Sequence, residues 1–82
     1  MQERQRSRGE SKALQELATK LAKDRKVQEY MRDVLIKRAN DAANAGDYAS
    51  SNLLLKQAEL VGETIKRLSD ELADILCKLG LN

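Results

Sequence analysis

The feature that most constrains the fold is an uninterrupted heptad repeat of apolar residues in the C-terminal half of the chain. Two rows of positions repeat every seven residues there and alternate at intervals of three and four. Leu54, Val61, Leu68 and Ile75 form one row, and Ala58, Ile65, Leu72 and Leu79 form the other. This spacing places both rows along one side of an α-helix and is typical of coiled-coil packing. The repeat therefore predicts a long helix that buries one stripe against a partner helix.

The N-terminal half carries a weaker form of the same repeat. Its predicted rows are Leu14, Leu21, Gln28, Leu35 and Ala42, and Leu17, Asp24, Met31, Arg38 and Ala45. The polar members Asp24, Gln28 and Arg38 either lie close to solvent or fix register and partner choice, as buried polar residues do in coiled coils. Because residues 12–45 contain no proline or glycine, we expect one continuous helix. The alternative is a break near Asp24, with residues 1–24 folding back as a third helix.

A turn is predicted where the two repeats meet. Gly46 can end a helix in the left-handed conformation, and Asp47 can cap the next helix. We expect a flexible basic arm at residues 1–10 and a helical hairpin at 11–82, with helices at about 11–45 and 47–79 and a turn at 45–47. Facing residues of an antiparallel hairpin have numbers with a constant sum. When each predicted row of the first helix is set against a row of the second, the paired residue numbers have one constant sum for the first two rows. For the other two rows the constant sum is smaller by one.

The composition agrees with an all-α, antiparallel two-helix hairpin. Charged residues make up 34% of the 82 residues, and proline, tryptophan and phenylalanine are absent. The single cysteine, Cys77, excludes a disulfide framework within one chain. The first residues lack the apolar core of a signal peptide, and no uncharged run is long enough to span a membrane. We therefore expect a cytoplasmic or nuclear protein that is not secreted and does not associate with membranes.

The apolar residues outside the two rows predict self-association. Val27, Tyr30 and Val34 form a stripe on the first helix, and Leu53 and Leu60 form another on the second. A lone hairpin leaves such residues in water, so we expect two hairpins to join into a homodimeric four-helix bundle, using these residues for dimerisation or partner binding. Gly62 lies in the middle of the second helix, where we expect it to permit the close approach of a neighbouring helix.

Charge is distributed unevenly between the two halves. Residues 1–38 contain 11 Lys/Arg and 6 Asp/Glu, a net charge of +5, whereas residues 39–82 contain 4 and 7, a net charge of −3. The positions that could contact nucleic-acid phosphates are Arg4, Arg6, Arg8, Lys20, Lys23, Arg25, Lys26 and Arg32. A pair of helices with opposite net charges is the simpler explanation of this asymmetry.

Catalytic and metal-binding patterns are missing from the sequence. Histidine is absent, which removes the commonest general base and metal ligand. Glu59, Glu63, Asp70 and Asp74 are expected on the outer face of the second helix, and Cys77 is expected as a surface thiol. We therefore expect no enzyme activity and no cofactor. The sequence favours a regulatory or adaptor module that binds itself and a protein partner, and the alternative is a small RNA- or DNA-binding regulator that uses the arm and the first helix.

Overall fold

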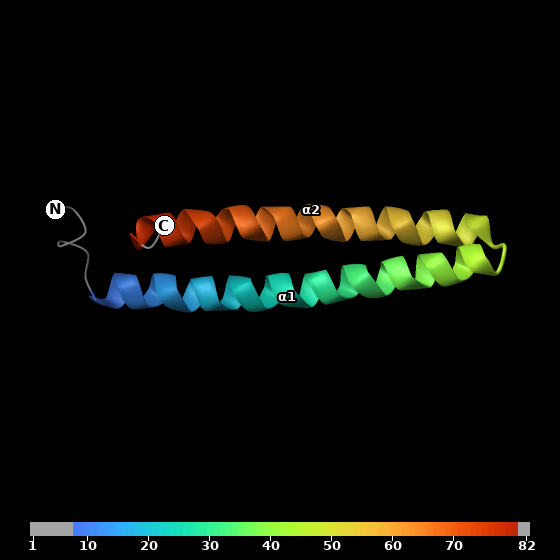
Figure 1. Cartoon of the computed structure of the whole chain (residues 1–82). Coiled ribbons are helices and arrows are strands. Elements are labelled where there is room, and N and C mark those ends of the chain that lie inside the picture. The colour runs from blue at the N-terminus through green and yellow to red at the C-terminus, as the bar shows by residue number, and fades with distance from the viewer. Residues whose placement is uncertain (1–7, 81–82) are drawn as a thin grey trace.

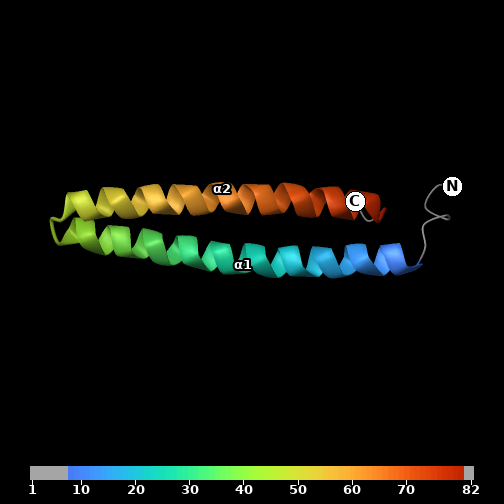
Figure 2. The same ribbon diagram turned by 180° about the vertical axis from the view of Figure 1, so that it is seen from behind.

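The computed structural model describes the backbone of residues 8–80 and the side chains of residues 9–80, and this part of the chain forms two helices. α1 (Arg8–Asn44) and α2 (Tyr48–Lys78) run antiparallel and are joined by a turn at residues 45–47 (Figure 1). Seen from behind, α2 again lies along α1 over its full length (Figure 2). The principal extents are 61 × 15 × 14 Å. The prediction of an all-α helical hairpin is confirmed.

The limits of α1 differ from the predicted ones at its start. The helix begins at Arg8 rather than at Ser11, so Gly9 lies inside the first turn. Residues 1–7 of the expected arm lie outside the described residues. α1 continues without a break through Asp24. The alternative with a third helix is therefore wrong, and the continuous helix is confirmed.

The turn is built from the local chemistry that the sequence predicts. Gly46 has a φ of 84°, and its N–H donates to the Ala43 carbonyl at 3.0 Å. The Asp47 N–H donates to the Ala42 carbonyl at 2.9 Å, which completes a Schellman arrangement at the end of α1. Asp47 then caps α2, because its Oδ1 accepts a hydrogen bond of 3.1 Å from the Ser50 N–H. The predicted roles of Gly46 and Asp47 are confirmed.

The last turn of α2 also ends at a glycine. Gly80 has a φ of 76°, and its N–H donates to the Cys77 carbonyl at 3.0 Å. This left-handed glycine therefore marks the end of the helix. Leu81 lies outside the described residues.

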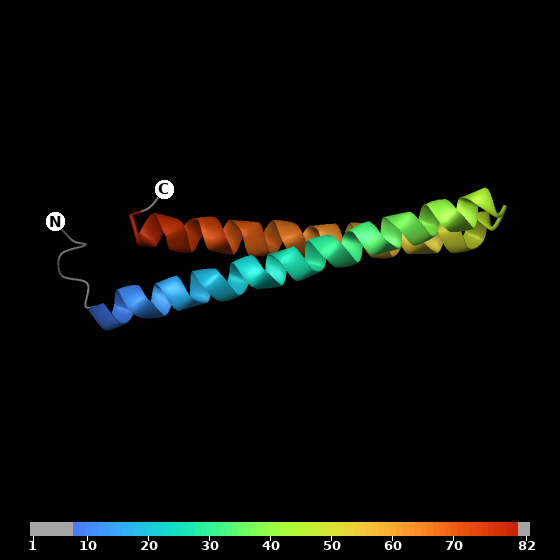
Figure 3. The same ribbon diagram turned by 60° about the horizontal axis from the view of Figure 1, so that its bottom comes forward.

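The two helices pack along a narrow seam, and three of its four predicted rows are confirmed by burial. Every residue of both α2 rows is buried or half-buried. The same holds for the row of α1 that contains Leu14, Leu21, Gln28, Leu35 and Ala42. In Figure 3, α1 passes across α2 near the turn and lies beside it at the open end, so the helices cross at a shallow angle.

The second row predicted on α1 is wrong by one residue. Leu17 and Met31 are 44% and 45% exposed, and Asp24, Arg38 and Ala45 are exposed as well. Except at Ala45, the next residue in the sequence faces α2 instead. The row consists of Ala18 and Ala39, which are buried, and of Arg25 and Arg32, which are half-buried.

Alanine occupies this row because the facing residues of α2 are large. Ala18 packs in one cluster with Ile75, and the same register places Ala39 opposite Leu54. A large side chain at either alanine would compete for the space that isoleucine or leucine fills from the other helix. The two large apolar residues of the predicted row, Leu17 and Met31, therefore lie on the flank of the seam.

A hydrophobic cluster lies near the open end of the hairpin. Ala18, Leu21 and Ile75 form a buried cluster, with partly buried leucines packed against it: Leu14, Leu68, Leu72 and Leu79. Among the described residues, no large side chain is fully buried. The hairpin thus has a seam but no closed core.

Candidate interaction surfaces

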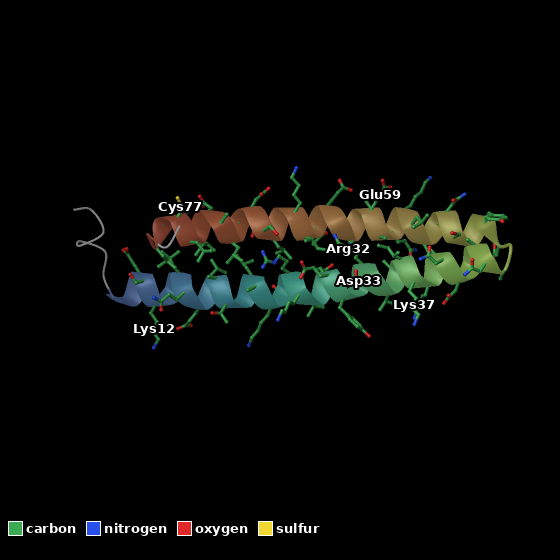
Figure 4. The ribbon with its side chains drawn as sticks, viewed as in Figure 1. Lys12, Arg32, Asp33, Lys37, Glu59 and Cys77 are labelled. Atoms are coloured by element: carbon green, nitrogen blue, oxygen red, sulfur yellow. The ribbon has the colours of Figure 1, made fainter. Side chains whose placement is uncertain are left out.

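The middle of the seam contains two arginines. Arg25 reaches across to α2, where its Nη1 donates to the Ser69 Oγ at 3.5 Å, and its buried Nε has no hydrogen-bond partner. Arg32 extends from α1 toward α2 (Figure 4). Both side chains are half-buried, and their aliphatic parts cover the seam where leucine would otherwise lie. Of the three polar positions in the predicted rows, Asp24 and Arg38 are exposed, which agrees with the alternative that places them close to solvent, and Gln28 is half-buried.

The residues predicted for dimerisation or partner binding form an exposed apolar set, which consists of Val27, Tyr30, Val34, Leu53 and Leu60. Four of them are largely exposed: Val27 at 56%, Tyr30 at 70%, Leu53 at 60% and Leu60 at 64%. Val34 is half-buried. At about 100° per residue, Val27, Val34, Leu53 and Leu60 lie on one flank of the hairpin, and Tyr30 lies on the outer side of α1.

The exposed apolar surface on α1 is larger than the predicted residues alone, because two residues of the wrongly predicted row belong to it. Met31 lies between Val27 and Val34 on the same flank, and Leu17 lies further along it toward the open end. Spacings of four and three residues join Val27, Met31 and Val34 into one stripe. This flank of α1 is therefore more apolar than its sequence pattern indicates.

A groove runs along the opposite flank of the hairpin, in the half nearer the turn. Its volume is about 860 Å³. Arg32 and Ile36 contribute from α1, and Leu55, Ala58 and Gly62 contribute from α2. Ile36 and Leu55 are 38% and 43% exposed. Charged and polar residues of α2 form the remaining lining: Asn52, Lys56, Glu59, Glu63 and Lys66.

Gly62 does not serve the role within the hairpin that its position suggested. A Cβ built on Gly62 has no atom within 4 Å beyond its own surroundings in the helix, so α1 does not approach it closely. The expected close approach of a neighbouring helix is therefore not made inside one chain. Gly62 lines the groove instead.

The predicted nucleic-acid-binding residues are divided between different surfaces. Lys20, Lys23 and Lys26 are exposed, whereas Arg25 and Arg32 are turned toward α2. Arg4 and Arg6 lie outside the described residues, as does the side chain of Arg8. Acidic residues are interspersed among these cations at Asp24, Glu29 and Asp33. The described cations therefore do not form one continuous basic stripe.

The remaining ionisable side chains lie on outer surfaces. Glu59, Glu63, Asp70 and Asp74 are exposed, as predicted, and Lys78 lies 3.3 Å from Asp74. Glu59 and Cys77 point away from α1, and Lys12 and Lys37 point away from α2 (Figure 4). Within residues 8–80, no three acidic or cysteine side chains are placed together so as to hold a metal ion. No helix in this range has the length and apolarity needed to cross a membrane.

Comparison with known proteins adds no relative to this description. The chain matches no protein-family model, and no curated protein or solved structure shows detectable similarity to it.

Proposed function

We propose that the chain is a non-catalytic helical interaction module, which self-associates into a four-helix bundle and binds a protein partner through its helix surfaces. The observation that supports this proposal is an imbalance of burial. Nine large apolar side chains are exposed in the described part of the chain, whereas no large side chain is fully buried there. A hairpin with this distribution gains further stability when its flanks are covered.

The energies involved are large relative to the stability of a small domain. Burying one large apolar side chain contributes about 1.5–3 kcal/mol. Domains are stable by only about 5–15 kcal/mol in total, and a chain of this size buries a smaller share of its surface on folding than a larger domain does. Covering a few of the exposed side chains would therefore change the stability of the hairpin substantially.

The apolar flank of α1 also indicates the kind of partner that fits. Val27, Met31 and Val34 repeat at helical spacing, and Tyr30 adds an aromatic ring with a polar tip beside them. Such a stripe complements the apolar face of an amphipathic helix, which is a common mode of peptide recognition. The partner for this flank is accordingly an amphipathic helix of another protein.

Light scattering combined with partner capture tests the proposal. The wild-type chain should elute with a mass near twice 9.2 kDa at micromolar concentration. A protein captured by the wild-type chain should be lost with the double variant Val27→Ser/Tyr30→Ser and kept with the control variant Lys23→Ser/Lys26→Ser. A mass of 9.2 kDa at every concentration would contradict self-association. Partners that bind both double variants equally would contradict the role of the exposed apolar set.

A small RNA- or DNA-binding regulator is the second candidate. The exposure of Lys20, Lys23 and Lys26 favours it, whereas the inward orientation of Arg25 and Arg32 weakens it. Salt-sensitive binding of mixed RNA or DNA that disappears after replacement of the arm arginines by alanine would favour this candidate. The residues to replace are Arg4, Arg6 and Arg8. No binding at low salt would rule it out.

A further inference from the structure

The apolar flank of α1 has a symmetric arrangement of charged and apolar side chains. Two adjacent rows of the heptad lie on this flank, beside the seam. One row contains Lys20, Val27, Val34 and Asp41, and the other contains Leu17, Asp24, Met31, Arg38 and Ala45. Val27 and Met31 are 56% and 45% exposed, and Val34 is half-buried. An apolar centre around Met31 is thus bordered by charged residues on both sides.

Each charged residue of the two rows has a counterpart of opposite sign on the other side of Met31. Asp24 and Arg38 lie seven residues before and after Met31. Lys20 and Asp41 lie eleven residues before and ten residues after it. All four side chains are exposed, and none of them forms an ion pair with another described residue of its own chain. Their charges are therefore available to a partner.

We propose that α1 of a second copy of the chain covers this flank, antiparallel to the first α1, with the two-fold axis beside Met31. This inference rests on the proposed self-association and names its contact. Across the dimer Asp24 faces Arg38, and Lys20 faces Asp41. Two-fold symmetry makes each of these oppositely charged pairs twice. A helix of another protein reaches the flank only by displacing the second copy.

The apolar centre fits the same arrangement. Val27 of each copy faces Val34 of the other, and the two Met31 side chains meet at the axis. Methionine suits this place because its flexible side chain adapts to a second methionine. The two rows therefore match their own reversed copy in apolarity as well as in charge.

Other antiparallel registers lack this match. A shift of one heptad in either direction sets charged side chains opposite apolar ones, such as Asp24 opposite Met31. The two intermediate registers set one row against the other and bring like charges together. One of them places Lys20 opposite Arg38, and the other places Asp24 opposite Asp41. The charges thus select the register centred on Met31.

Two exposed side chains border the proposed contact. Tyr30 lies on the outer side of α1 next to the axis, and the seam register places Leu60 of α2 close to the level of Met31. The register also brings Lys23 near Lys37 of the second copy. Both lysines belong to the outermost row of α1 and are exposed, so water and salt screen their repulsion.

Exchange of two charges tests the register. The single variant Asp24→Arg should raise the dimer dissociation constant about tenfold, because two attractive pairs become repulsive. The double variant Asp24→Arg/Arg38→Asp has the composition of the wild type and should restore the dimer, because both pairs are re-formed with their signs exchanged. Residues 24 and 38 are about four turns apart, so they do not pair within one chain. Sedimentation equilibrium measures both variants, and a double variant as weak as the single one would overturn the register.

Disulfide crosslinking tests the position of the axis. In a background carrying Cys77→Ser, the variant Met31→Cys should form a disulfide-linked dimer on mild oxidation, because the two Cα atoms lie close together at the axis. The control variant Ile36→Cys, on the opposite flank, should remain a monomer in denaturing electrophoresis without reducing agent. Crosslinking through Ile36→Cys but not through Met31→Cys would overturn this flank as the dimer contact while leaving self-association intact. A wild-type chain that is monomeric at every concentration would instead refute self-association itself.

Discussion

Replacing Ala39 by leucine tests where the seam lies on α1. Ala39 is 0% exposed, and the register places it opposite Leu54. The added carbon atoms have no space there, so the helices must separate or the side chain must leave its preferred rotamer. Overpacking of this kind costs about 1–3 kcal/mol. For a domain of this size, each kcal/mol lowers the melting temperature by about 4–8 °C.

The adjacent substitution Arg38→Leu is the matched control. Arg38 belongs to the row that the sequence predicted and that the structure places in solvent. It should change the free energy of unfolding by no more than about 0.5 kcal/mol. Urea and thermal unfolding followed by circular dichroism, at one protein concentration, measure both variants. A stable Ala39→Leu chain together with a clearly stabilised Arg38→Leu chain would show that the seam passes through Leu17 and Met31 instead of Ala18 and Ala39.

Three further substitutions have expected outcomes. Arg25→Met should raise the free energy of unfolding by about 1 kcal/mol, because it removes a buried Nε without a partner; a lower urea midpoint would contradict this. Gly46→Ala should lower it by about 1–2 kcal/mol, because φ is 84°, and an unchanged thermal midpoint would count against this. Hydrogen bonds from the Ser50 side chain and backbone lower the pKa of Asp47 below its ordinary value of 3.8. The resulting stabilisation is complete above pH 3.8 and is lost as the pH falls through the lower pKa of the folded state. Acid should therefore destabilise the wild type more than the variant Asp47→Asn. Equal dependence of the unfolding free energy on pH in both proteins would disprove this.

The turn and the seam of α2 were predictable because their signals are local and unambiguous. Gly46 and Asp47 act through backbone conformation and a single cap, which depend on few other residues. On α2, every position of both rows is apolar, so no other stripe of the helix competes with the seam. Local chemistry and strong periodicity therefore determined these parts of the fold.

The second row of α1 was not predictable from apolarity alone. A row that lies three residues after Leu14 and one that lies four residues after it both fit the helical period. Leu17 and Met31 favour the first spacing by their size, but the large residues of α2 leave room only for Ala18 and Ala39. One signal in the sequence did favour the second spacing. With it, all facing pairs share a single sum of residue numbers, whereas the predicted rows required two.

The groove became visible only when both helices were placed. Ile36 and Gly62 belong to different helices, and only the packed hairpin brings them to the same flank. The glycine was identified in the sequence as a point of close approach, but the sequence does not show whether the approaching helix comes from the same chain. The empty space above Gly62 shows that α1 does not make this approach.

The dependence of the thermal midpoint on protein concentration is the most direct test of the central claim, which is that the hairpin is completed by a second copy. Unfolding of a dimer is coupled to dissociation, so its midpoint rises with protein concentration, whereas the midpoint of a monomer does not. We predict a midpoint that increases steadily as the chain is concentrated. A midpoint that is independent of concentration, for a chain with a mass of 9.2 kDa, would contradict the account.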